Sequence, residues 1–233
     1  MKRRLAAAAA LLLLVLAGGA WWVYGNLDAI VLRAITRYGS QMTGAKVSVD
    51  AVQLRSTDGI GVVRGLVVGN PPGFRTPHAL KVGVIEVEVA VRTLTDPVIV
   101  VKRIVIDAPD LNYEKGDTMT NFDAIQQNIA RSLASGSPGE KGVTGTPPRK
   151  LIVEELLIRG AHARATAPTL LGKTVSATLP DVRLRQLGRA EGGLTPGQLG
   201  QVVARAISQR LVASLAFDRL KSLGDRVKGL FGH

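Results

Sequence analysis

The spacing of apolar residues changes along the first half of the chain, and each change predicts a different kind of element. An uncharged run extends from Leu5 to Leu27, and helical spacing of apolar positions then predicts a helix over 28–42. Gly44 ends that helix. From Val47 onward apolar and polar side chains alternate, which is typical of strands with one buried face. The strands predicted here cover 47–51, 52–54, 60–68, 80–91, 98–108 and 111–113.

The second half returns to helical spacing and then to strands. A helix is predicted over 121–133, followed by a segment at 135–150 whose Gly, Ser, Pro and Lys content is typical of a flexible loop. Thr195 and Pro196 mark the start of a final amphipathic helix, as its N-cap and first helical residue. The strands predicted between these helices cover 151–158, 161–166, 169–179 and 181–187.

Together these elements predict an α+β fold that is mostly β. We expect a curled antiparallel sheet with a hydrophobic concave face and a few packed helices. Apolar residues occupy both faces of the strand at 98–108, and such a strand is either covered on both sides or lines an apolar space. Residues 151–233 are expected to belong to the same domain as 26–134.

The first 25 residues have the pattern of a segment that enters a membrane. Positive charges precede the apolar run and aromatic residues lie near its far end, as a bilayer favours. The length predicts an intact transmembrane anchor, whereas the small residues from Ala17 to Ala20 would also suit a cleaved signal peptide. Either way, we expect the bulk of the chain beyond an inner membrane. The residues predicted to set the anchor are Lys2, Arg3, Arg4, Trp21, Trp22 and Tyr24.

The composition and charge of the chain limit the classes of partner that it is expected to bind. The 233 residues carry a net charge of +12, which either attracts the protein to anionic lipid headgroups or keeps it soluble. Basic and aromatic residues do not interleave as in single-strand nucleic-acid binders, so no nucleic-acid partner is expected. The sequence has no cysteine, which excludes disulfides and thiolate metal sites.

The sequence gives only weak signals for catalytic groups. The three histidines are scattered, without the spacing of metal ligands. Gly59, Gly61 and Gly65 lie inside a predicted strand and not at a strand–helix turn, so they do not suit a phosphate-binding loop. Glu86 and Glu88 share one strand face, where solvent exposure is the default for a carboxylate pair. We therefore expect no enzyme activity, no catalytic residue, no cofactor and no metal.

Motifs between 35 and 129 resemble the AsmA-like family of inner-membrane-anchored periplasmic proteins. The most specific is the loop Asn70-Pro71-Pro72-Gly73-Phe74 between two strands. It is accompanied by Thr43-Gly44-Ala45-Lys46-Val47, Gly65-Leu66-Val67-Val68, Ile104-Val105-Ile106-Asp107-Ala108-Pro109, Tyr113-Glu114 and Asn121-Phe122. The resemblance implies a curled β-sheet with an apolar groove, related to bridge-like lipid-transfer proteins, and a role in phospholipid traffic. This chain is too short to cross the periplasm alone.

The expectation is therefore a lipid-binding protein that holds phospholipid acyl chains on an aliphatic sheet face. The same face could equally be an ordinary core beneath a helix. The alternative function is a non-catalytic scaffold that binds other envelope proteins through its sheet. The candidate groove residues are Val47, Val49, Val84, Ile85, Val87, Val89, Val98, Val100, Ile104 and Ile106.

Overall fold

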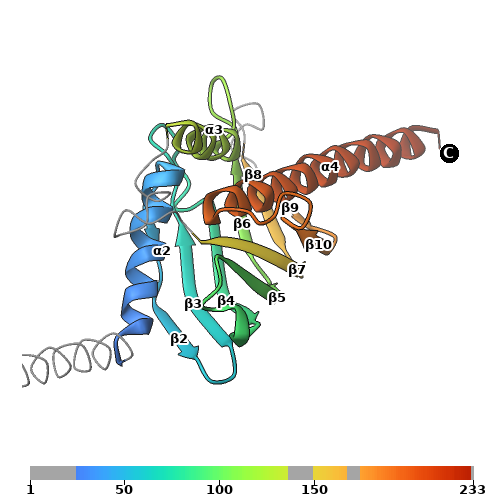
Figure 1. Ribbon diagram of the computed structural model, residues 1–233. Coiled ribbons are helices and arrows are strands. Elements are labelled where there is room, and N and C mark those ends of the chain that lie inside the picture. Colours follow the sequence, from blue (N-terminus) through green and yellow to red (C-terminus); the bar gives the residue numbers. More distant parts are fainter. Residues whose placement is uncertain (1–24, 136–148, 167–173, 232–233) are drawn as a thin grey trace, which may run out of the picture.

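The computed structural model describes residues 25–135, 149–166 and 174–231. Within these ranges the chain forms three α-helices, one short 3-10 helix and ten strands in one mixed sheet (Figure 1). The helices are α2 (Leu27–Thr43), α3 (Asn121–Ala134) and α4 (Pro196–Phe231), and η1 covers Val91–Thr93. The strands are β1 (Val47–Ser48), β2 (Ala51–Arg55), β3 (Ile60–Val68), β4 (Leu80–Val89), β5 (Val98–Asp107), β6 (Asp110–Glu114), β7 (Lys150–Arg159), β8 (His162–Thr166), β9 (Thr174–Thr178) and β10 (Val182–Leu187).

The α+β prediction is confirmed, and most predicted elements lie within a few residues of the observed ones. The strand predicted over 80–91 ends earlier, at Val89, because the chain turns into η1. The predicted anchor, with Lys2, Arg3, Arg4, Trp21, Trp22 and Tyr24, lies outside the described residues, as does most of the predicted loop at 135–150. No helix in the described part of the chain has both the length and the hydropathy to cross a bilayer.

The prediction of an antiparallel sheet is wrong, because two of the pairings are parallel. β5 pairs with β7 in parallel from Val98↔Lys150 to Asp107↔Arg159, and β6 pairs with β8 in the same sense. Parallel neighbours need a crossover connection of a dozen or more residues, and the chain between β5 and β7 contains β6 and α3. The remaining pairings are antiparallel.

The ten described strands occupy six neighbouring positions across the sheet, which we call lines. Two of the lines are single strands, β3 and β4, and each of the other four consists of two shorter strands placed end to end. β5 and β6 run beside β4 one after the other, and β7 and β8 continue them in the next line. β10 and β9 form the line beyond, and β1 and β2 form the line on the other side of β3. The sheet is therefore six long lines wide, with β1–β2 at one edge and β9–β10 at the other.

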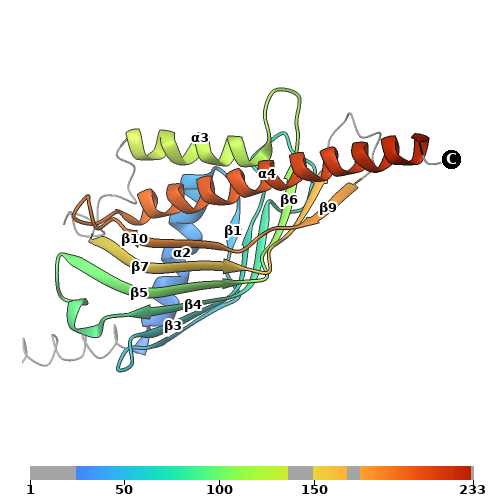
Figure 2. The same cartoon turned by 90° about the vertical axis from the view of Figure 1, so that its right-hand side faces the viewer.

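The four interruptions lie in one row across the sheet, which continues through a glycine inside each of the unbroken strands β3 and β4, and this row forms a crease. Figure 2 shows the strands bending at this line. The crease positions are Asp50, Gly65, Gly83, Ala108-Pro109, Gly160-Ala161 and Pro180, which are neighbours through the strand register. Ala108 and Gly160 have φ of 44° and 60°, in the left-handed region. The expectation of a curled sheet is wrong: the sheet does not curl, and the strands bend at the crease.

Helices cover one face of the sheet. The core beneath them includes Leu156 and Ile158 of β7, which are 1% and 2% exposed. The helices contribute Phe122, Ile125 and Ile129 from α3 and Ile207 and Leu211 from α4.

α2 follows the β1–β2 edge. The Ser40 hydroxyl accepts a hydrogen bond from Val47 N at 2.9 Å, and Asp28 Oδ1 accepts one from Leu54 N at 3.0 Å. These contacts satisfy backbone donors that an open edge strand would leave to solvent.

Candidate functional site

The aliphatic face of β4 and β5 lies on the helix-covered side of the sheet, and the helices close it only in part. We call Ile85, Val87, Val89, Ile104 and Ile106 the central apolar face. All five are half-buried, whereas Leu156 and Ile158, the β7 neighbours of Ile104 and Ile106 in register, are almost fully buried. Burial therefore falls from β7 to β4 along one continuous aliphatic surface.

The arrangement of the helices explains this gradient. α4 packs against β7, β9 and β10, and α2 packs against β1 and β2. The central strands β3, β4 and β5 lie between these two helices (Figure 1). Val87, Val89, Ile104 and Ile106 contact the edge of the buried core, whereas Ile85 lies farther out, beside Ile106. The central apolar face is thus a partly open extension of the core.

The other candidate groove residues lie elsewhere. Val47 and Val49 are buried near α2, at 3% and 9% exposure. Val84 pairs with Arg64 and with Asp107, and it lies on the opposite face of the sheet from Ile85. Val98 and Val100 are half-buried and out of phase with the buried Val101. Of the ten residues chosen from the sequence, the structure brings together the five of the central apolar face.

The opposite face of the sheet is charged. Glu155 of β7 lies within 3.4 Å of Arg103, 3.2 Å of Arg183 and 3.7 Å of Arg185. The Arg159 guanidinium donates to Asp107 and holds the pKa of that carboxyl below its ordinary value. The arginines and Asp107 are exposed, whereas Glu155 is half-buried, so water screens these ion pairs and they contribute little stability. These charged side chains make their part of the face unsuitable for acyl chains.

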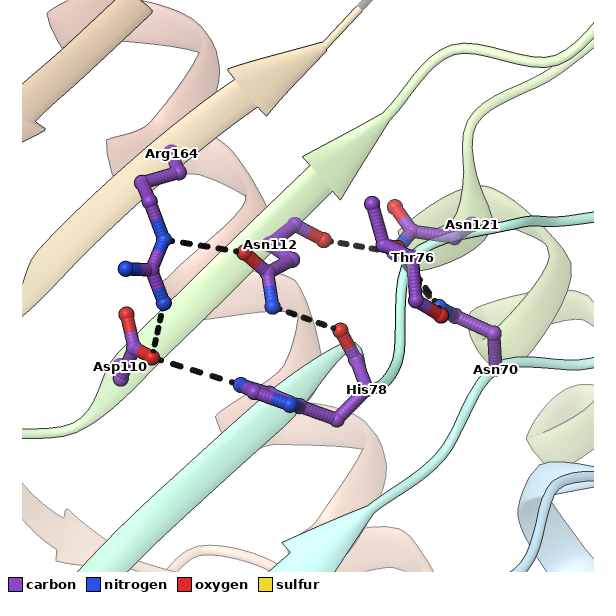
Figure 3. Close-up of polar contacts among 7 residues, drawn as sticks. All are labelled: Asn70, Thr76, His78, Asp110, Asn112, Asn121 and Arg164. Atoms are coloured by element: carbon purple, nitrogen blue, oxygen red, sulfur yellow. Dashed lines mark hydrogen bonds and ion pairs between the residues drawn. The ribbon is translucent and has the colours of Figure 1, made fainter. Parts of the chain in front are cut away.

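A buried polar cluster fixes the Asn70–Phe74 loop to the sheet and to α3 (Figure 3). Asn121, at the start of α3, is 0% exposed. Its amide nitrogen donates to Asn70 Oδ1 at 2.8 Å and to the Asn112 carbonyl at 2.6 Å. Its side-chain oxygen accepts from the backbone nitrogens of Glu114 and Phe122, each at 3.0 Å. The amide therefore uses both of its donors and both acceptor positions.

Glu114 extends this cluster into the segment that follows the loop. Its carboxylate accepts hydrogen bonds from the backbone nitrogens of Arg75 and Thr76 and from the Thr76 hydroxyl, at 2.7 to 2.9 Å. Burial acts to raise the pKa of Glu114, but the hydrogen bonds from Thr76 and Arg75 outweigh it and leave the pKa below its ordinary value. The carboxylate is therefore a structural acceptor for this turn of the backbone.

A second polar group lies at the outer side of the cluster. Asp110 accepts from Arg164 at 2.5 Å and lies 3.3 Å from His78 Nε2, and Arg164 Nε donates to Asn112 Oδ1 at 3.2 Å. Among the residues whose side chains the structure describes, no three His, Asp or Glu groups gather in a way that could hold a metal ion. The contacts of Asp110 join β6, β8 and the start of β4, which is a structural role.

No pattern in the sequence predicts this cluster. Asn70 and Asn121 appear in the motifs that carry the AsmA-like resemblance, but nothing in the hydrophobic pattern assigns them a contact. A usable signal is the asparagine placed directly after the N-cap Thr120, where its side chain can reach back to the preceding strand. Searches against protein-family models and against curated proteins found no match to this chain.

Proposed function

We propose that this chain is an inner-membrane-anchored, periplasmic lipid-binding protein that contributes to phospholipid transport or to maintenance of the outer envelope. Phospholipid acyl chains would lie on the central apolar face. The predicted single-pass anchor would hold the domain at the membrane from which the lipid is taken. The observation that carries the proposal is the half-buried state of that face, beside the fully buried side chains of β7.

Physical chemistry supports an aliphatic ligand at this place. Ile85, Val87, Val89, Ile104 and Ile106 present aliphatic groups without a polar side chain among them. Each methylene that is fully buried against such a surface gains about 0.8 kcal/mol. An acyl chain offers many methylenes and needs no hydrogen-bond partner, so the site requires no polar or catalytic group.

The AsmA-like resemblance supports the same proposal independently. Asn70 and Asn121, which belong to separate motifs of that resemblance, are hydrogen-bonded to each other. The loop that carries the most specific motif is therefore part of the framework that positions β4 and β6.

The test is photo-crosslinking from single positions of the full chain in its native membrane. A photoreactive phenylalanine derivative replaces Val87, on the central apolar face, and Val84 in a matched variant provides the control on the opposite face. We expect ultraviolet-dependent phospholipid adducts, detected by mass spectrometry, from position 87 and none from position 84. A second variant, Ile104→Asp, combined with the reactive group at position 87, should abolish the adduct.

The scaffold function is the alternative, and the charged opposite face is the observation that favours it. The three arginines around the half-buried Glu155 form an exposed polar surface that could meet a protein partner. Equal lipid adducts from positions 84 and 87, or none from either, would argue against lipid on the central apolar face. Protein adducts at position 84 without lipid at position 87 would favour the scaffold.

A further inference from the structure

The outer edge of β9 differs from the other edges of the sheet. The β1–β2 edge is covered by α2, whose Ser40 and Asp28 accept hydrogen bonds from edge-strand nitrogens. β10 carries Arg183 and Arg185, and Gln186 has φ of 56°, which bends the strand. Charges and bends of this kind are how proteins prevent strand pairing at an edge. β9 has no charged side chain and no residue with positive φ.

The hydrogen bonds around β8 show which backbone groups of β9 point outward. Leu179 N donates to the Ala161 carbonyl, and His162 N donates away from β9, to Pro109. Hydrogen-bonded positions alternate along an antiparallel pair, so Ala177 and Val175 pair with β8. Thr174, Ser176 and Thr178 therefore direct their N–H and C=O groups to the free side. No other strand in the described ranges pairs with that side.

The sequence of β9 is self-complementary. It reads Thr-Val-Ser-Ala-Thr, without charge or proline. In an antiparallel pair of two copies centred on Ser176, Ser176 faces its counterpart and Thr174 faces Thr178. The three outward-facing residues then all fall at hydrogen-bonded positions, where opposed residues exchange both of their backbone hydrogen bonds. Val175 is 38% exposed and would gain the Ala177 side chain of the second copy as its neighbour.

α4 supplies a second observation at the same edge. Leu211 is fully buried against the sheet, but the helix continues to Phe231, and both views show it running past β9 (Figures 1 and 2). The backbone of α4 therefore reaches beyond the edge that β9 forms.

We propose that two copies of this chain associate through β9, in antiparallel register about Ser176, so that their sheets become one continuous sheet. A two-fold axis perpendicular to the sheet keeps both helix layers on the same side. Each α4 then extends over the other copy. The helices add the contact area that a five-residue strand alone lacks. This inference is independent of the lipid proposal, and it holds whether or not the central apolar face carries lipid.

The chain has no cysteine, so single cysteines can report the register. In the proposed pair, the two Ser176 Cα atoms lie about 5.5 Å apart, within the range of a disulfide. The two Thr174 residues lie about 13 Å apart along the strands, as do the two Thr178 residues, which is out of range. Thr174 and Thr178 of opposite copies are again within range.

The experiment is mild oxidation of the full chain in native membranes, followed by non-reducing electrophoresis. We expect a disulfide-linked dimer from Ser176→Cys and from the double variant Thr174→Cys/Thr178→Cys. Either single variant, Thr174→Cys or Thr178→Cys, should give about tenfold less, because its sulfurs cannot meet. Adding Ser176→Pro to the double variant removes one N–H that points to the free side of β9 and keeps the hydrogen bonds between β9 and β8. Because proline cannot donate to the second copy, we expect this variant to form no dimer.

Two results would overturn the proposal. One is the absence of a dimer from both Ser176→Cys and the double variant when the protein is present in the membrane at its normal level. The other is equal dimer from all single-cysteine variants, which would indicate random collision in place of a defined register.

Discussion

The side-chain amide of Asn121 donates a hydrogen bond to the side-chain oxygen of Asn70 over 2.8 Å, although the two residues lie 51 positions apart in the sequence. This contact joins the start of α3 to the loop that follows β3. The Asn70 amide in turn donates to the Thr76 carbonyl and hydroxyl. One buried side chain thus connects the loop, β6 and α3.

Asn121→Ala should lower the free energy of unfolding by about 3 kcal/mol, because it leaves buried donors and acceptors without partners. Urea denaturation of the full chain measures the loss. Asn128→Ala is the matched control: its amide donates one hydrogen bond to the Thr43 carbonyl at a partly buried site and accepts one from Arg131 at an exposed site, and their loss should cost about 1 kcal/mol. Similar losses in the two variants would mean that the cluster does not act as a connected unit.

Glu114 should give stability a dependence on pH in the acid range. Its pKa lies below the ordinary value of 4.5 in the folded protein, so its ionised form contributes stability that is fully present above that pH. The contribution is lost as the pH falls through the lowered pKa. Glu114→Gln should therefore reduce stability at pH 7 and flatten the decline below pH 4.5.

Denaturation midpoints measured from pH 7 to pH 3 test this expectation. Glu88→Gln provides the control, since Glu88 is exposed and pairs with Lys102 at the surface. An acid decline as steep in Glu114→Gln as in the unmodified chain would show that other carboxylates cause it.

The crease in the sheet depends on glycine at Gly65. Its φ is 63°, and a Cβ there would lie 1.9 Å from Asp50 Oδ2. Gly65→Ala should destabilise the protein by at least about 1 kcal/mol from backbone conformation alone, with the clash in addition. Gly83, opposite in the crease, has space for a Cβ, and Gly83→Ala should be neutral or raise stability by about 0.5 kcal/mol. Thermal unfolding of the two variants side by side measures the difference, and equal effects would contradict a specific role for Gly65.

Local patterns in the sequence predicted the elements but not how they pair. The helix at α3 follows from apolar spacing and from a capping box in which Thr120 and Asp123 bond each other. The parallel pairing of β5 with β7 depends on where the chain between them crosses, which no local period records. The crease depends on breaks that become neighbours only once the register is set.

The candidate site was predicted in part for the same reason. Alternation along β4 separates Val84 from Ile85, because successive side chains point to opposite faces. Treating both as one apolar lining merged two faces of the sheet. Val47 and Val49 are aliphatic like the residues of the central apolar face, and what distinguishes them is burial near α2. Burial depends on helix placement, which the hydrophobic pattern does not determine.

One side of α4 packs against the core. Substitutions at two adjacent residues, one on the packed side and one on the exposed side, can test this. Leu211 is 0% exposed in the core, whereas Val212 is 55% exposed. Leu211→Ala should cost about 2 to 5 kcal/mol, since it removes a buried side chain and leaves a cavity. Val212→Ala should change stability by less than about 0.5 kcal/mol. Chemical denaturation distinguishes them, and hydrogen exchange of α4 should rise in the Leu211 variant. A large loss from Val212→Ala would instead indicate that this exposed side of α4 packs against a further surface, such as the second copy proposed above.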